Sequence, residues 1–183
     1  MPAEPQILKR REAARTRLFR VEELSLRFSN GVERVYERLC HPARGAVLIV
    51  AMLDEDTVLL IREYGAGVEG YELGLPKGAC EAGEDRLVAA NRELMEETGY
   101  GAHHLEFIKS ITLSPSYMTH DIDVILAQDL YEKRLPGDEP EPIEVVPWSM
   151  SDIDSLMARS DFTEGRSIAA LYLVRDYLAR KRR

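Results

Sequence analysis

The stretch Gly78-Ala-Cys-Glu-Ala-Gly-Glu84, followed after seven residues by Arg92-Glu-Leu-Met-Glu-Glu-Thr-Gly-Tyr100, decides how this chain folds. Glu93, Glu96 and Glu97 lie three and four residues apart, so a helix would place their carboxylates on one stripe. Like charges at this spacing destabilise an isolated helix by roughly a few tenths of a kcal/mol per pair. Magnesium and similar hard cations bind oxygen ligands of this kind and would neutralise the cluster. The stretch therefore predicts a cation-binding helix behind a glycine loop.

The same stretch fills every position of the Nudix box, which reads Gly, five residues, Glu, seven residues, Arg-Glu-apolar-any-Glu-Glu-any-Gly-apolar. Seven of these positions require one residue type, so chance agreement is on the order of 10⁻⁸ per starting position. The chain thus resembles the Nudix hydrolases; the alternative is a solvated acidic helix face, the usual origin of a charge run. The positions are occupied by Gly78, Glu84, Arg92, Glu93, Leu94, Glu96, Glu97, Gly99 and Tyr100.

Length and composition describe a chain of 183 residues with 45% hydrophobic and 31% charged residues. This is the size of one domain, or of one domain with a small appendage, and the balance is typical of a soluble globular protein. No apolar run approaches the roughly 18 residues of a membrane span, and the first residues lack the apolar stretch of a secretory signal. Cys40 and Cys80 match neither a metal-ligand spacing nor a disulfide framework. We therefore expect a cytoplasmic protein with reduced thiols and no membrane partner.

The net charge of −8 argues against long nucleic acid as a partner, because such binding requires a broad basic surface. Basic residues gather at residues 9–17 and at residues 180–183. The second group would offset the dipole at the end of a helix, and an anion-binding patch is the alternative.

Alternating apolar and polar residues predict a β-hairpin over residues 18–39, because Asn30-Gly31 between such runs is a strong hairpin signal. An almost wholly apolar run at residues 46–53 predicts a buried strand. Further strands are expected at 57–64, 71–73, 105–113, 122–130 and 143–148, with a glycine loop at 74–78 and a polar loop at 131–142.

The first helix is expected from about Glu84 to Thr98. Leu87 and Leu94 would pack against the sheet while the carboxylates stay in a cleft. Gly99 is placed for a left-handed C-cap, which would end the helix there.

The remaining elements predict an α/β chain. Two more helices are expected at 152–160 and 164–180, so the order of elements indicates a mixed sheet between helices. The resemblance implies the same architecture, a Nudix α/β/α sandwich over residues 46–183. Residues 1–45 would form a small N-terminal antiparallel β segment.

The resemblance implies hydrolysis of nucleoside diphosphates linked to another moiety, with Mg²⁺ as cofactor or Mn²⁺ in its place. Cations held by carboxylates draw charge from the pyrophosphate, position the substrate and acidify bound water. The first candidate ligands are Glu93 and Glu97. Glu96 and the backbone carbonyl of Lys77 follow.

Three residues of the box are assigned to the catalytic machinery around these ligands. Glu96 lies between the candidate ligands Glu93 and Glu97 in the sequence. Arg92 can hold a carboxylate in bidentate fashion, and Glu84 lies at the helix N-terminus, where the dipole favours an anion. Arg92 and Glu84 are therefore expected to brace the helix.

Two segments outside the box indicate the substrate. Ser114-Pro115-Ser116-Tyr117 resembles the proline marker of ADP-ribose pyrophosphatases, with Ser116 in place of the usual glycine; an ordinary Ser-Pro turn is the alternative. The acidic loop at 137–145 resembles the loop that carries a catalytic base and a metal ligand in ADP-ribose hydrolases. Glu139 is then the candidate base and Glu141 the candidate ligand; a solvated, proline-stiffened loop is the alternative.

Over its whole length the chain resembles the Nudix subgroup of ADP-compound hydrolases, in segments such as Ile61-Arg-Glu-Tyr64 and Tyr71-Glu-Leu73. The resemblance implies ADP-ribose, NADH and diadenosine triphosphate as substrates, with release of AMP. Strand residues that merely pack or face solvent are the alternative for each contact. The candidate substrate contacts are Arg62, Arg38, Tyr36, Tyr71, Pro115 and Tyr117.

The main alternative function is a dinucleoside polyphosphate hydrolase or RNA 5′-end pyrophosphohydrolase. Leu75-Pro-Lys-Gly78 favours it, because ADP-ribose enzymes more often have alanine at the position of Lys77. A sensor that binds ADP-ribose without cleaving it is disfavoured by the complete glutamate set. The resemblance further implies small nucleotides as partners, and a homodimer formed by pairing of the N-terminal β segments.

Overall fold

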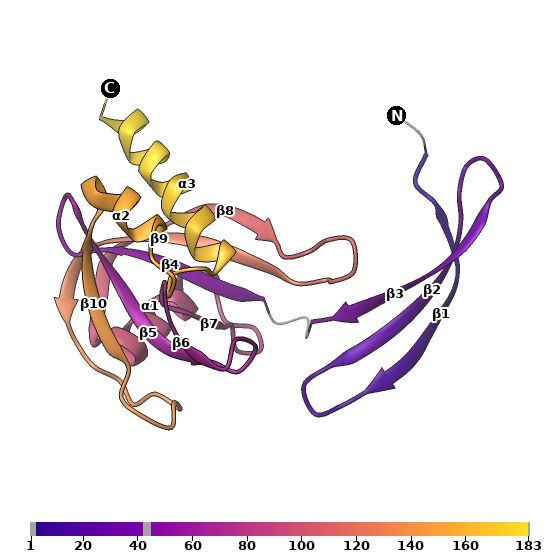
Figure 1. The fold of residues 1–183 in the computed structure, drawn as a ribbon, viewed down its shortest axis with the longest axis horizontal. Helices are drawn as coiled ribbons and strands as arrows, with labels where there is room; N and C mark the ends of the chain where they lie inside the picture. The colour runs from indigo at the N-terminus through magenta and orange to yellow at the C-terminus, as the bar shows by residue number, and fades with distance from the viewer. Residues whose placement is uncertain (1–2, 42–44, 183) are drawn as a thin grey trace. The chain divides into compact units, whose positions relative to one another are not determined.

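A computed structural model of the chain describes residues 3–41 and 45–182 (Figure 1). In the described residues no helix is long and apolar enough to cross a membrane. Cys40 and Cys80 are buried free thiols. Two compact units are present and are described separately: the N-terminal unit (Met1–Ala43 with Thr112–Asp121) and the main unit (Arg44–Ile111 with Ile122–Arg183).

The N-terminal unit contains an antiparallel sheet of β1 (Gln6–Arg15), β2 (Arg20–Arg27) and β3 (Glu33–Cys40), in that order. β2 and β3 confirm the predicted hairpin, and Gly31 in its turn has a left-handed φ of 82°. The sequence pattern does not predict β1, because its residues are exposed throughout and show no apolar alternation. Backbone pairing with β2 forms this strand.

The main unit is built on a mixed sheet with β4 (Ala46–Met52) at its centre. All seven residues of β4 are buried, as the apolar run predicts. β4 runs parallel to β9 and antiparallel to β5. Within the described residues the order is β10-β5-β4-β9-β8, with β6 paired to β5 and β7 to β4. The other strands are β5 (Thr57–Gly65), β6 (Gly70–Gly74), β7 (Lys77–Ala79), β8 (Tyr100–Thr112), β9 (Asp121–Glu132) and β10 (Glu144–Ser149).

The helices are α1 (Arg86–Thr98), the 3₁₀ turn η1 (Met150–Asp152), α2 (Ile153–Met157) and α3 (Gly165–Lys181). Successive residues of a strand point to opposite faces of its sheet. Leu48 and Val50 of β4 pack in one core with α3, whereas Val47 and Ile49 pack in a second core with α1. Figure 1 shows these helices on opposite sides of the strands. The expected α/β/α sandwich is confirmed.

Local caps determine where α1 begins and ends. Asp85 Oδ1 accepts a hydrogen bond from the Leu87 N–H at 2.8 Å, so the helix begins after Asp85. The sequence predicts a start at about Glu84, and this part of the prediction is wrong. At the other end Gly99 has φ 79° and its N–H donates to Met95 O, which confirms the expected left-handed C-cap. Glu84 therefore precedes the first turn.

Two further elements differ from expectation. β7 forms at the end of the expected glycine loop, because Lys77 and Gly78 pair with Leu48 and Val47 of β4. The helix expected at 152–160 is shorter, because α2 covers only Ile153–Met157 and the 3₁₀ turn η1 precedes it. The first difference arises from strand pairing that a local sequence window does not contain.

We expect Leu94→Ala to lower the free energy of unfolding by about 2–5 kcal/mol, because it removes packing and leaves a cavity. Leu94 is fully buried in the core between α1 and the sheet. Urea denaturation followed by circular dichroism measures the change. Val88→Ala, on the same helix at a side chain that is 59% exposed, is the matched control and should change stability by less than about 0.5 kcal/mol. Equal losses in the two variants would contradict the packing described.

Candidate active site

The box carboxylates lie where α1 meets β7. A Cβ atom added at Gly78 would lie 1.9 Å from Glu93 Cδ, which no side chain could tolerate without displacing Glu93. Glycine at this position therefore allows β7 and α1 to approach closely. The approach places the Glu93 carboxylate against the backbone of β7.

Arg92 holds three carboxylates together. Its Nε and Nη2 donate to the two oxygens of Glu84 at 3.0 and 2.9 Å, as a bidentate pair. Its Nη1 donates to Glu93 at 2.8 Å and to Glu96 at 3.0 Å. The hydrogen bonds with Glu84 raise the pKa of Arg92 and lower the pKa of Glu84. Arg92 thereby offsets part of the repulsion among these carboxylates.

Glu97 is only 3% exposed and accepts a hydrogen bond from the Lys77 backbone N–H at 2.9 Å. Burial raises the pKa of Glu97 to about 8, although Lys77 acts in the opposite direction. Burial also raises the pKa of Glu93, against the effect of Arg92. A bound cation would stabilise the ionised forms of both groups.

Glu63 on β5 is a further acidic side chain at this place, and the sequence pattern does not single it out. Its carboxylate pairs with Lys77 Nζ at 2.5 Å. The charge of the Lys77 ammonium is therefore already balanced. The only sequence signal for Glu63 is its place in the segment Ile61-Arg-Glu-Tyr64, and tertiary packing brings it to Lys77.

The acidic loop begins beside the C-terminal half of α1. The Leu135 N–H donates to Met95 O at 3.2 Å. A Cβ atom at Gly137 would lie 3.8 Å from Glu96 O and 2.5 Å from Glu139 Oε2. The loop therefore passes next to α1 at the turn that carries Glu96.

This path brings the candidate base Glu139 near the box. Burial is the largest cause of the raised pKa of Glu93, and the charge of Glu139 also raises it. Glu96, Glu139 and Glu141 line one cavity of about 510 Å³. The structure thus brings the acidic loop and the box carboxylates into one site.

An adjoining cavity of about 350 Å³ shares the acidic loop as one wall. Its other wall contains Arg62, Tyr64 and Tyr71, and the two tyrosine rings lie 5.5 Å apart at an angle of 70°. The hydroxyl of Tyr71 donates to the carboxylate of Glu141. Glu141 is therefore engaged with Tyr71 in this structure.

Arg62 is held by two carboxylates that the sequence analysis does not identify. Its Nε pairs with Glu144 at 2.9 Å and its Nη1 with Asp161 at 2.8 Å. Asp161 also accepts two hydrogen bonds from Arg159, both at 2.8 Å. The guanidinium groups of Arg159 and Arg62 hold the pKa of Asp161 well below its usual range. The register of β10 against β5 places Glu144 opposite Arg62, but no local pattern indicates Asp161.

The other four candidate substrate contacts, Arg38, Tyr36, Pro115 and Tyr117, belong to the N-terminal unit and are described within it. Arg38 pairs with Glu22 at 2.6 Å. Tyr117 is 55% exposed, and its carbonyl accepts a hydrogen bond from the Leu39 N–H at 2.8 Å. Their role toward a substrate stays a prediction.

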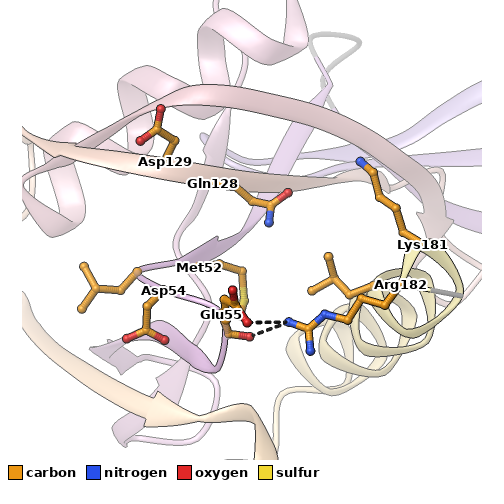
Figure 2. Close-up of a pocket in the computed structure, with 9 residues that line it drawn as sticks. Met52, Asp54, Glu55, Gln128, Asp129, Lys181 and Arg182 are labelled. Atoms are coloured by element: carbon orange, nitrogen blue, oxygen red, sulfur yellow. Dashed lines mark hydrogen bonds and ion pairs between the residues drawn. The ribbon is translucent and has the colours of Figure 1, made fainter.

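A larger cavity, of about 730 Å³, lies at the end of β4 that is remote from β7. Figure 2 shows Arg182 directed toward Glu55, whose carbonyl accepts a hydrogen bond from Arg182 at 3.2 Å. Asp129 and Lys181 also line this cavity. Its described lining includes no residue of the box or of the acidic loop, so size alone does not identify the site.

The donor set at α1 and β7 suits a hard divalent cation. Glu93, Glu96 and Glu97 offer carboxylate oxygens, and the Lys77 carbonyl is a further oxygen donor of the kind that Mg²⁺ binds. In the described part of the chain no three His, Cys, Asp or Glu side chains are grouped as a ready metal site. Arg92 bridges Glu93 and Glu96, so a cation would compete with Arg92 for these carboxylates.

Asp161 is expected to make the stability of the main unit depend on pH. Its pKa is lowered from 3.8, so the ionised form stabilises the folded state above that value and stops doing so as the pH falls. We expect Asp161→Asn to lower the free energy of unfolding near neutral pH by about 1–3 kcal/mol. The difference from wild type should shrink below about pH 4.

Urea denaturation across this pH range measures the difference. Asp176→Asn is the matched control: its pair with Arg175 spans 3.2 Å, and the Asp176 side chain is 64% exposed. The control should change stability by less than about 0.5 kcal/mol. If the loss in Asp161→Asn were independent of pH, the ion pairs would not be its cause.

Comparisons with known proteins agree with this geometry. The family model described as "NUDIX domain" matches residues 42–171, and the one described as "NudE-type Nudix hydrolase N-terminal domain" matches residues 5–38. The ADP compounds hydrolase NudE of Escherichia coli (strain K12) is 49% identical over 174 residues, which cover 95% of this chain and 93% of that protein. The ADP-ribose pyrophosphatase of Bacillus subtilis (strain 168) is 31% identical over 153 residues, covering 82% and 80%.

A solved structure described as "Crystal structure of ADP compounds hydrolase" has the same fold. It superposes with a TM-score of 0.92 at 46% sequence identity, covering 99% of this chain and 97% of that one. The motif, the mixed sheet between helices and the sequence similarity lead to one conclusion: the chain is an enzyme of the Nudix hydrolase family.

Proposed function

We propose that the protein hydrolyses the pyrophosphate bond of ADP-containing compounds and releases AMP. ADP-ribose, NADH and diadenosine triphosphate are the proposed substrates. The observation that carries the activity is the burial of Glu93 and Glu97 against β7, beside the acidic loop with Glu139. The 49% identity over 95% of the chain to a protein named ADP compounds hydrolase supports the substrate class.

The proposed cofactor is Mg²⁺, or Mn²⁺ in its place, since Nudix hydrolases generally need a divalent cation. Glu93, Glu97 and Glu96 would hold it, with the Lys77 carbonyl and Glu141 as further ligands. When bound, the cation withdraws charge from the pyrophosphate and acidifies coordinated water.

The remaining side chains of the site have distinct proposed roles. Glu139 lines the cavity that contains Glu96, and it would accept the proton of the attacking water. Arg92 holds Glu84 in bidentate fashion and so keeps the start of α1 in place. Geometry of this kind contributes to the rate because positioned groups react without prior rearrangement.

The adjoining cavity is the proposed place for a substrate ring. Arg62 is balanced by Glu144 and Asp161, so its guanidinium has little net charge to offer a phosphate. A planar guanidinium and exposed tyrosine rings are suited to stacking on a nucleobase. We therefore assign Arg62 and Tyr71 to a planar group of the substrate. Contacts by Arg38, Pro115 and Tyr117 are proposed on the resemblance alone.

One observation, the presence of Lys77, favours the alternative substrates. Lys77 stands where ADP-ribose enzymes more often have alanine, which favours dinucleoside polyphosphates or RNA 5′ ends. The Lys77 ammonium is paired with Glu63, so its charge is offset within the site. The net charge of −8 also opposes binding of long RNA. Short ADP compounds remain the favoured substrates.

We also propose that the N-terminal β segment, residues 1–45, joins two copies of the chain, with the Nudix domain at 46–183. The support is that the three-stranded sheet exposes apolar side chains on both faces. Ile7, Val35 and Tyr36 are 43%, 62% and 45% exposed, and the adjacent Val35 and Tyr36 point to opposite faces. Exposed apolar side chains in one small sheet favour an interface.

Gel filtration with light scattering should give a mass of about twice the 20.8 kDa of one chain. Val35→Glu would place a charge on the sheet and should shift the protein toward the monomer. Val68→Glu is the control, because Val68 is similarly exposed, at 56%, but lies in the main unit. A wild-type mass near 20.8 kDa would contradict the dimer.

We expect wild type with Mg²⁺ to release AMP from ADP-ribose, and Glu97→Gln to lower turnover by about 10²-fold or more, because a site for the cation loses a carboxylate. Glu139→Gln should lower kcat by about 10²-fold with little change in KM, since a base acts only in the transition state. Chromatography of the products measures AMP from each of the three substrates.

Asp138→Asn is the matched control for the acidic loop, because it removes a neighbouring carboxylate that is exposed. Unchanged turnover in Glu139→Gln would remove Glu139 from the mechanism. Absence of AMP from all three compounds, with either cation, would contradict the proposed substrate class. RNA with a 5′-triphosphate and dinucleoside polyphosphates would then be the next substrates tried.

A further inference from the structure

The segment that leads into the acidic loop crosses the C-terminal end of α1. The Lys133 N–H donates to Gly99 O at 2.9 Å, and the Leu135 N–H donates to Met95 O at 3.2 Å. Met95 O already accepts the Gly99 N–H of the helix cap, so the Leu135 N–H is a second donor to the same carbonyl. Other carbonyls in the last turn of a helix need partners from outside it. The segment therefore docks on α1 through its backbone.

Arg134, between these two residues, adds its side chain to the same helix end. Its Nη2 donates to Thr98 O at 3.2 Å, and its Nη1 lies 3.5 Å from Glu96 O. The last turn of α1 contains no basic residue of its own. The Arg134 guanidinium thus supplies the positive charge that the negative end of a helix dipole favours.

Gly99 makes room for this guanidinium. A Cβ atom at Gly99 would lie 2.9 Å from Nη2 and 3.1 Å from Nε of Arg134. Gly99 also has a left-handed φ of 79°, which side chains disfavour. Gly99 therefore both ends the helix and leaves space for the Arg134 guanidinium.

Glu139 follows closely on the docked segment. Only four residues separate Arg134 from Glu139, and Pro136 among them restricts the backbone. Gly137, next along the chain, approaches both Glu96 O and the Glu139 carboxylate. A shift of the anchor would therefore move the candidate base relative to α1.

From these contacts we infer that Arg134 is a positioning residue, which holds the acidic loop on the C-terminal end of α1 and thereby sets the place of Glu139. The inference rests on the proposed function for the role of Glu139, whereas the anchoring itself does not. Arg134 lies outside the box.

The anchoring is tested by hydrogen exchange of the loop amides at 137–141, followed by mass spectrometry in the intact protein. Arg134→Gln should speed their exchange by about tenfold, because the loop opens more often. Arg134→Lys keeps the charge at the helix end and should restore part of the protection. Lys133→Gln, which removes the neighbouring exposed charge, is the matched control and should leave exchange unchanged. Equal exchange in Arg134→Gln and wild type would overturn the inference.

The link to Glu139 is tested by a double-mutant cycle with ADP-ribose. Arg134→Gln alone should lower kcat by about tenfold with little effect on KM, because a small misplacement of a catalytic group is costly. Combined with Glu139→Gln it should cause no further loss, since the group that it positions is gone. Losses that multiply would show that Arg134 does not act through Glu139 and would overturn that part of the inference. If wild type released no AMP, the proposed function would fail, and the exchange experiment would still decide the anchoring.

Discussion

Repulsion among glutamates on one helix is the constraint on which the rest of this structure depends. The chain meets it first with Arg92, which bridges Glu84, Glu93 and Glu96. Glu97 differs from these three, because it is buried and accepts a hydrogen bond from the Lys77 backbone N–H. Burial raises its pKa to about 8, in the direction expected for a carboxylate whose charge is not fully offset by nearby groups. An arrangement of this kind is suited to a bound divalent cation.

The sandwich provides the stiffness that such a site requires. β4 is buried on both faces, so α1 and α3 pack against a common strand from opposite sides. β7 pairs with β4 and carries Gly78, whose missing side chain admits Glu93. Glu93 and Glu97 therefore pack against a paired strand rather than against an unpaired loop. Displacement of α1 would have to disturb the core as well as the site.

The sequence predicted the parts of this molecule that local chemistry controls. The apolar run of β4, the turn at Gly31 and the cap at Gly99 all follow from residues next to one another in the chain. β1 escaped prediction because its exposed residues carry no apolar period and its partner strand forms it. α1 begins at Arg86 rather than at about Glu84, because Asp85 caps its N-terminus.

The box by itself determined the family, the acidic helix and the need for a compensating charge, because all of these depend on spacing within one helix and one adjoining loop. Only the tertiary structure decided which distant groups meet it. Glu63 reaches Lys77 through sheet packing, Asp161 reaches Arg62 from a loop, and Arg134 reaches Thr98 across the helix end. Sequence periodicity does not indicate such contacts, because each joins groups that are far apart in the chain. The distance between those groups is set by how sheets and helices pack.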